Sequence, residues 1–165
     1  MQNAPDAVAS DAAAGEARQF ISFTIGDEEY GVDIMAIREI KGWTATTELP
    51  NTPPYVRGVI NLRGAIVPIF DLRTRFGGGV TTASARHVIM VVSVRARVVG
   101  ILVDAVADII TITAGNIQPV PELERKTDST FLSGLVTVEG RMVALLDLDS
   151  LFDAELTADL HSFAA

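Results

Sequence analysis

The stretch Gly58-Val-Ile-Asn-Leu-Arg-Gly-Ala-Ile-Val-Pro-Ile-Phe-Asp-Leu72 decides the fold of this chain. Its two apolar, β-branched segments flank the dipeptide Arg63-Gly64, a pattern typical of a β-hairpin with a two-residue turn. Asp71 follows directly, and a carboxylate at that place accepts the free backbone amides of a first helical turn. The stretch therefore predicts strands over Val56–Leu62 and Ala65–Phe70 and a short helix over Leu72–Phe76.

A second hairpin is predicted upstream, where two further β-branched and aromatic segments, Phe20–Ile25 and Glu29–Asp33, flank the dipeptide Gly26-Asp27. Apolar residues at helical spacing then predict a short helical turn before Gly42, formed around Ile34, Ile37 and Ile40. Downstream of the central stretch, three consecutive glycines, Gly77–Gly79, predict a flexible joint.

The same order of elements returns after the joint, so the chain contains an internal repeat. At an offset of 69 residues, Phe20–Ile25 falls on Ile89–Val94 and Gly31 falls on Gly100. An insertion near residues 122–128 changes the offset to 76. With that offset Gly58 falls on Gly134, Asp71 on Asp147 and Phe76 on Phe152. Because glycines, strand residues and capping acids match in order, we interpret the chain as a duplicated small β-barrel.

The predicted fold is mainly β, with two SH3-like, five-stranded β-barrels in tandem, short helices and a C-terminal helix. Residues 1–17 are predicted to be a disordered tail, and residues 18–152 a single domain. Its first barrel should span about 18–79 and its second about 86–152, with exchange of strands between the barrels left open. Residues 153–165 are predicted to be a helical tail because Phe152, Leu156, Leu160 and Phe163 recur at helical spacing.

Composition narrows the class of protein. The 165 residues carry a formal charge of −8 and no cysteine, which disfavours nucleic-acid binding and excludes disulfides and thiolate metal sites. The N-terminus lacks the basic and apolar regions of a signal peptide, and no apolar run reaches about 18 residues. A cytoplasmic protein without direct membrane insertion is therefore expected.

No catalytic constellation is recognisable in the sequence. The only histidines are His87 and His161, and neither stands in a motif for nucleophilic or acid–base catalysis. Asp147 and Asp149 are a closely spaced pair of carboxylates, with no third ligand in a known pattern. The prediction is a protein that is not an enzyme and that uses no cofactor and no metal.

Several segments together resemble the CheW family of bacterial chemotaxis adaptors. The central stretch from Gly58 to Leu72 looks like the signature of that family. Phe23-Thr-Ile-Gly-Asp-Glu-Glu-Tyr-Gly-Val-Asp-Ile34 and Ile37-Arg-Glu-Ile40 are similar to its opening segments. Pro50-Asn-Thr-Pro53 is similar to its loop, and Val98-Val-Gly-Ile-Leu-Val-Asp104 to its second half.

The resemblance implies a scaffold with two protein partners, located at receptor arrays on the inner face of the membrane. One partner would be the helical hairpin tip of a methyl-accepting chemoreceptor, bound in a groove between the barrels. The other would be the regulatory domain of the histidine kinase CheA, docked barrel to barrel. Carried over from the family, the receptor-binding candidates are Arg63, Glu39, Ile37, Val88, Val99 and Gly100, and the kinase-binding candidates are Gly58 and Ile40.

Alternatives remain open at this point. The chain could serve a non-flagellar receptor-kinase pathway, such as pilus motility, because the resemblance does not separate the two. A regulatory module that binds kinase but no receptor would leave the groove residues dispensable. A small β-barrel ligand-binding domain would need a polar pocket with perturbed acids.

Overall fold

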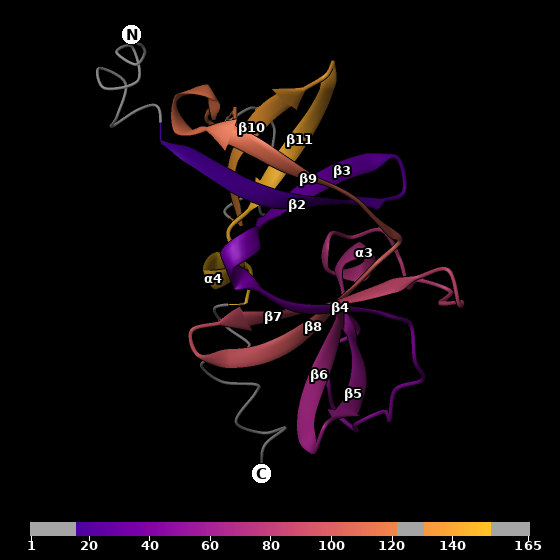
Figure 1. Ribbon diagram of the computed structural model, residues 1–165. Coiled ribbons are helices and arrows are strands. Elements are labelled where there is room, and N and C mark those ends of the chain that lie inside the picture. Colours follow the sequence, from indigo (N-terminus) through magenta and orange to yellow (C-terminus); the bar gives the residue numbers. More distant parts are fainter. Residues whose placement is uncertain (1–15, 122–130, 153–165) are drawn as a thin grey trace, which may run out of the picture.

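The computed structural model describes residues 16–121 and 131–152, and most of its regular structure consists of strands (Figure 1). Most of the N-terminal tail and all of the expected C-terminal helical tail lie outside these ranges. The strands are β2 (Ala17–Ile25), β3 (Glu28–Asp33), β4 (Ile37–Gly42), β5 (Val56–Leu62), β6 (Ala65–Asp71), β7 (Val88–Val94), β8 (Arg97–Val103), β9 (Ala105–Thr113), β10 (Leu132–Val138) and β11 (Arg141–Leu146). The helices are single turns: η1 (Ile34–Ala36), α3 (Leu72–Arg75), η2 (Ala114–Asn116) and α4 (Leu148–Leu151).

The described strands form two five-stranded sheets, which are the two SH3-like barrels predicted from the sequence. One sheet has the order β4-β7-β8-β6-β5 and comes from the continuous segment 37–103; we call it the continuous barrel. The other has the order β10-β11-β3-β2-β9 and combines residues 17–33 with residues 105–146; we call it the split barrel. Figure 1 shows the split barrel above the continuous barrel, with α3 and α4 between them.

The barrels therefore do not follow the halves of the sequence. The expected segments of about 18–79 and 86–152 describe the repeat, whereas each sheet combines the first two strands of one repeat with the last three strands of the other. Parallel pairing makes this exchange: β3 pairs with β11, and β8 pairs with β6. In repeat-equivalent terms the two sheet orders are identical, so the exchange is reciprocal.

Each barrel is closed by one bridge outside its regular strands. Thr47 pairs with Val59 in the continuous barrel, and Gln118 pairs with Leu135 in the split barrel. Gly58 lies under the first closure at a φ of +132°, and a Cβ atom there would collide with the carbonyl oxygen of Thr47. The backbone approaches itself so closely that only glycine fits this position without strain.

Three apolar clusters hold the molecule together. One fills the split barrel around Phe20 and Leu145, and one fills the continuous barrel around Ile69 and Ile89. The largest cluster joins the barrels, because alternate residues of the central strands face outward from each barrel toward the other. Strand β7 shows this alternation: Ile89 and Val91 point into the continuous barrel, whereas Met90 and Val92 belong to the joining cluster.

Two local predictions have clear outcomes. Asp71 and Asp147 cap α3 and α4 as predicted, accepting hydrogen bonds from the backbone amides of Thr74 and Ser150. The predicted helix around Ile34, Ile37 and Ile40 is wrong beyond residue 36, because Ile37–Gly42 is strand β4. Its pairing with β7 supplies the backbone partners, and a bulge between Ile37 and Glu39 disturbs the alternation of β4. No helix in the described ranges has the length and apolarity that a membrane crossing requires.

Candidate functional site

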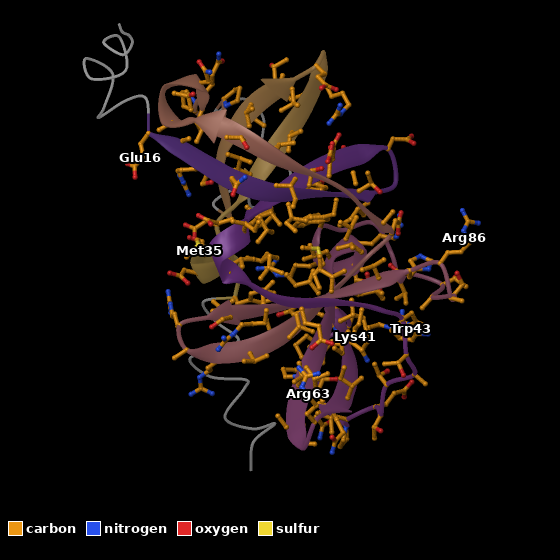
Figure 2. All side chains as sticks on the ribbon, in the orientation of Figure 1. Glu16, Met35, Lys41, Trp43, Arg63 and Arg86 are labelled. Atoms are coloured by element: carbon orange, nitrogen blue, oxygen red, sulfur yellow. The ribbon has the colours of Figure 1, made fainter. Side chains whose placement is uncertain are left out.

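An ion pair joins the two polar residues proposed for receptor binding. Arg63 lies in the turn between β5 and β6, and its guanidinium Nη2 lies 2.6 Å from Glu39 Oε1 on β4. The turn needs positive φ at Arg63 (50°) and Gly64 (90°), and Asn61 Oδ1 accepts a hydrogen bond from the Gly64 amide at 2.9 Å. This geometry aims Arg63 into solvent, with 72% of its side chain exposed. Figure 2 shows it on the continuous barrel.

The pair keeps its charges fixed over the ordinary pH range. The hydrogen bond from Arg63 lowers the pKa of the Glu39 carboxyl, and the same bond raises the pKa of the Arg63 guanidinium. Both groups are open to water, so the pair contributes little to folding. A guanidinium with free donors beside a carboxylate can still recognise polar groups of another protein.

The apolar candidates Ile37 and Val88 lie at the edge of the joining cluster. Ile37 begins β4 and Val88 begins β7, and both are partly buried against that cluster. Ile37 pairs with Val92, whereas Val88 pairs with Gly42, so the two candidates stand at opposite ends of the β4–β7 ladder. A partner that touched both would lie along this ladder.

Val99 and Gly100 are buried within the protein. Val99 is 0% exposed in the joining cluster, and a Cβ atom at Gly100 would lie 2.5 Å from Ile69 Cδ1. Neither position presents a side chain to solvent. The missing side chain of Gly100 lets β8 lie close to Ile69 of β6.

The two kinase-binding candidates differ from each other in solvent exposure. Ile40 on β4 is 41% exposed and available for contact. Gly58 is buried beneath the Thr47 backbone, so it shapes the closure of the barrel and offers no side chain. All eight candidates belong to elements of the continuous barrel.

Sequence reasoning missed three exposed apolar residues, Ile66, Ile109 and Met142, which the repeat relates to one another or to the candidate Ile40. Ile66 on β6 and Met142 on β11 are 61% and 60% exposed, and they are equivalent at the offset of 76. Ile40 and Ile109 are equivalent at the offset of 69, and Ile109 is 52% exposed. Comparing outward-facing strand positions between the repeats would have found them.

A buried polar network supports the loop beside the continuous barrel. Asp71 is 0% exposed and accepts hydrogen bonds from the Thr81 amide at 2.8 Å and the Thr81 hydroxyl at 2.7 Å. Arg57 Nη1 lies 3.3 Å from Asp71 Oδ2 and donates to the Thr81 carbonyl, while its guanidinium stacks over Trp43. The segment after the three glycines is therefore anchored at Thr81, only two residues beyond the stretch predicted to be a flexible joint.

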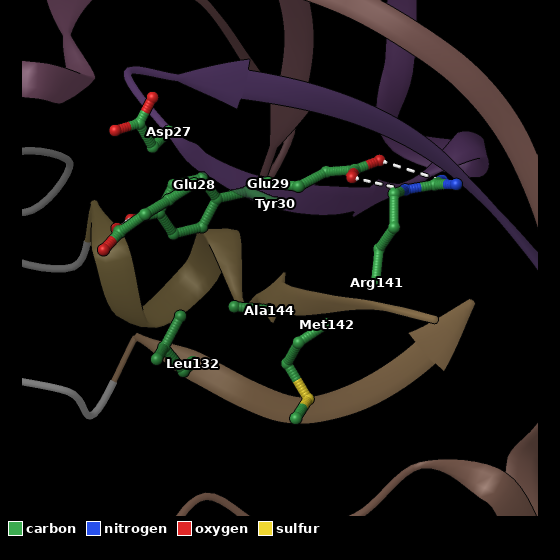
Figure 3. A pocket seen from close by; sticks show the side chains of 8 residues that line it. All are labelled: Asp27, Glu28, Glu29, Tyr30, Leu132, Arg141, Met142 and Ala144. Atoms are coloured by element: carbon green, nitrogen blue, oxygen red, sulfur yellow. Dashed lines mark hydrogen bonds and ion pairs between the residues drawn. The ribbon is translucent and has the colours of Figure 1, made fainter. Parts of the chain in front are cut away.

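A separate hollow of about 600 Å³ opens on the split barrel between β3 and β11 (Figure 3). Arg141 bridges to Glu29 across it, with Nε 2.9 Å from Oε1, and this bond lowers the pKa of Glu29. The Tyr30 hydroxyl donates to Glu28 at 2.6 Å, and burial raises the pKa of that hydroxyl. The polar groups satisfy one another here, and no candidate residue from the sequence lies in this hollow.

Comparison with known proteins identifies the family. The family model for the CheW-like domain matches residues 19–156. The chain is 49% identical to a chemotaxis protein CheW of Rhizobium meliloti, covering 84% of this chain and 89% of that protein. It is 42% identical to the chemotaxis protein CheW of Klebsiella aerogenes, covering 92% of each. The crystal structure of a scaffolding CheW protein from Thermoanaerobacter tengcongensis superposes with a TM-score of 0.76 at 33% identity, covering 83% of this chain and 88% of that one. The double barrel, the matched segments and these similarities together place this chain in the CheW family.

Proposed function

We propose that this chain is a non-enzymatic scaffold that joins the cytoplasmic tips of chemoreceptors to the regulatory domain of the histidine kinase CheA. Membership of the CheW family supports the general role. The single observation that carries the assignment of a surface is the exposed pair of Arg63 and Glu39 on the continuous barrel.

The repeat shows that this pair is not a requirement of the fold. The equivalent positions in the split barrel are Glu139 and Asp108, two acids that cannot form the same pair. Glu139 nevertheless adopts the same turn, with a φ of 50°. Because the backbone is kept and the side chains differ, the Arg–Glu pair belongs to a surface used for recognition.

The receptor tip is proposed to lie along the β4–β7 ladder, with Arg63 and Glu39 as polar contacts and Ile37 and Val88 as apolar ones. Val99, Gly100 and Gly58 act from beneath by setting the shape of this barrel. A few buried apolar contacts give such a helical partner its affinity, and the charges fix its register. The kinase is proposed to contact the exposed side of β4 at Ile40.

A pull-down with a chemoreceptor tip fragment and a kinase regulatory domain tests the proposal. Wild-type protein should retain both partners. Arg63→Asp should lower the affinity for the receptor tip by about 30-fold or more while kinase retention and folding stay unchanged. The matched control is Glu139→Arg, a charge reversal in the same turn of the other barrel, which should leave receptor binding intact.

A charge exchange separates recognition from internal support. In the double variant Arg63→Glu with Glu39→Arg, the ion pair can re-form with its polarity reversed. Receptor binding should stay weak if Arg63 contacts the partner. Full recovery of binding would show instead that the pair only orders the turn, and normal binding by Arg63→Asp alone would remove this surface from the proposal.

The kinase surface has its own pair of variants. Ile40→Asp should reduce retention of the kinase regulatory domain while receptor retention persists, because a charge replaces an exposed apolar contact. Ile109→Asp places the same change at the equivalent position of the split barrel and should still retain the kinase regulatory domain. If wild type and Ile40→Asp retain the kinase regulatory domain equally, the kinase contact does not include Ile40.

A further inference from the structure

The two junctions between the barrels are related by the repeat, and the first is filled by a guanidinium. Arg73 on α3 reaches Asp104, where the chain crosses from the continuous to the split barrel, and its Nε donates to Thr81 Oγ1 at 3.2 Å. Asp104 also accepts the Gly26 amide at 2.8 Å, and His87 Nε2 lies 3.4 Å from it. One arginine side chain therefore occupies the space beside the crossover.

The second junction has the same backbone plan but lacks that arginine. At the offset of 76 the equivalent of Arg73 is Asp149 on α4, whose carboxylate points toward Arg95 at 3.9 Å. Asp33 ends β3 at the other crossover, two repeat positions before the place that Asp104 holds after the end of β8. A hollow of about 320 Å³ remains here, lined by Arg18, Asp33, Ala36, Ser93, Ser133, Leu146, Asp147, Leu148 and Asp149.

The lining of this hollow matches the chemistry of an arginine side chain. Three carboxylates and two hydroxyls offer acceptors. The one cation in the lining, Arg18, is paired with Asp33 at 3.0 Å, and Arg95 lies 3.9 Å from Asp149. Leu146, Leu148 and Ala36 form an apolar wall that suits the methylene stem of an arginine. An anion would meet a surplus of negative charge, whereas a planar guanidinium finds carboxylates on more than one side.

We propose that this hollow receives an arginine side chain from a partner protein, in the place that Arg73 fills at the first junction. The hollow adjoins η1, and Ala36 in its wall directly precedes Ile37 of the proposed receptor surface. The arginine is therefore assigned to the receptor tip, an assignment that rests on the function proposed above. Arg73, which fills the equivalent place at the first junction, indicates that the ligand is an arginine side chain.

A small probe tests the hollow independently of any receptor. In a titration of isotope-labelled protein with N-acetyl-arginine amide, amide resonances of Met35, Ser93, Ser133 and Asp149 should shift together. The dissociation constant should be on the order of 1 mM, as expected for a ligand of this size. N-acetyl-citrulline amide, which has the same shape without the charge, should cause no saturable shifts. Equal shifts with both probes, or none at this hollow, would overturn the site.

The variant Asp149→Arg supplies the missing guanidinium from the chain itself, at the position equivalent to Arg73. It should abolish saturable binding of the arginine probe and lower receptor-tip binding at least tenfold, with kinase retention as in wild type. The control Asp149→Ala, which removes the carboxylate without filling the space, should keep measurable binding of both. If the probe binds wild type but Asp149→Arg retains the receptor fully, the arginine does not come from the receptor. The proposed function is tested separately by the variant Arg63→Asp, whose loss of receptor binding does not depend on the hollow.

Discussion

The two barrels close in the same way, yet they hold their closures by different means. In the continuous barrel the closing glycine has a positive φ that other residues rarely adopt, and a fully buried carboxylate, Asp71, ties the following loop to Arg57 and Thr81. In the split barrel the equivalent carboxylate, Asp147, is only partly buried and bonds Ser150 within its own helix. The barrel with the rigid closure also carries every binding residue that was predicted from the sequence. Rigid support of a binding surface preserves its shape before the partner arrives, which favours tight recognition.

The largest expected difference between the barrels is at their closing glycines. Gly58→Ala should lower the free energy of unfolding by about 3 kcal/mol or more, because the new Cβ meets backbone atoms at positive φ. Gly134→Ala should cost about 1–2 kcal/mol, since its nearest obstacle is the side chain of Ile117 and its φ is not positive. Urea denaturation of both variants measures the difference. Equal losses would mean that the two closures are equally tight.

The capping acids give the next largest difference. Asp71→Ala should cost about 3–5 kcal/mol, because it leaves Arg57 with an uncompensated charge beside a buried loop. Asp147→Ala should cost about 1 kcal/mol, the usual loss for a helix N-cap. Thermal unfolding of the two variants checks the order. A larger loss at Asp147 would contradict the view that only the continuous barrel is locked by its polar network.

The smallest expected effect is a pH dependence at the first crossover. Burial alone would raise the pKa of Asp104, but the hydrogen bonds from Arg73 and Gly26 and the charges of Arg73 and His87 outweigh it and lower that pKa below 3.8. The charged form therefore stabilises the folded state at neutral pH, and this contribution is lost as the pH falls through the lowered pKa. Between about pH 5 and pH 3, wild type should lose more stability than Asp104→Asn. If the stabilities of wild type and Asp104→Asn fall in parallel as the pH is lowered, Asp104 does not have this role.

Local patterns in the sequence were enough to predict most elements and the repeat. The turn at Arg63-Gly64, the caps at Asp71 and Asp147, and strands such as Val56–Leu62 rest on short-range rules that tertiary contacts did not override. The isoleucines at 34, 37 and 40 misled because a spacing of three fits a helix as well as a bulged strand. Pairing between β3 and β11 had no signal of its own, since repeated strands are interchangeable by pattern alone.

The candidate site was less accessible than the fold from sequence alone. The resemblance led to Arg63 and Glu39, which the structure brings together, but it could not distinguish exposed Ile40 from buried Val99. Burial depends on which strand lies next to which, and that was the information missing. The anchoring of Thr81 by Asp71 was invisible for the same reason, because a short helix and three glycines separate them in the chain.

Along the sequence, the segment of the continuous barrel lies between the two segments of the split barrel. This order has a consequence for how the protein is made. During translation the segment 37–103 emerges as a complete set of neighbours and can fold as soon as β8 leaves the ribosome. The hairpin of β2 and β3, although synthesised first, must wait for residues 105–146 before its sheet is complete. The earliest strands of the nascent chain are thus the last to acquire all their partners, and they are the ones most exposed to chaperones in the interval.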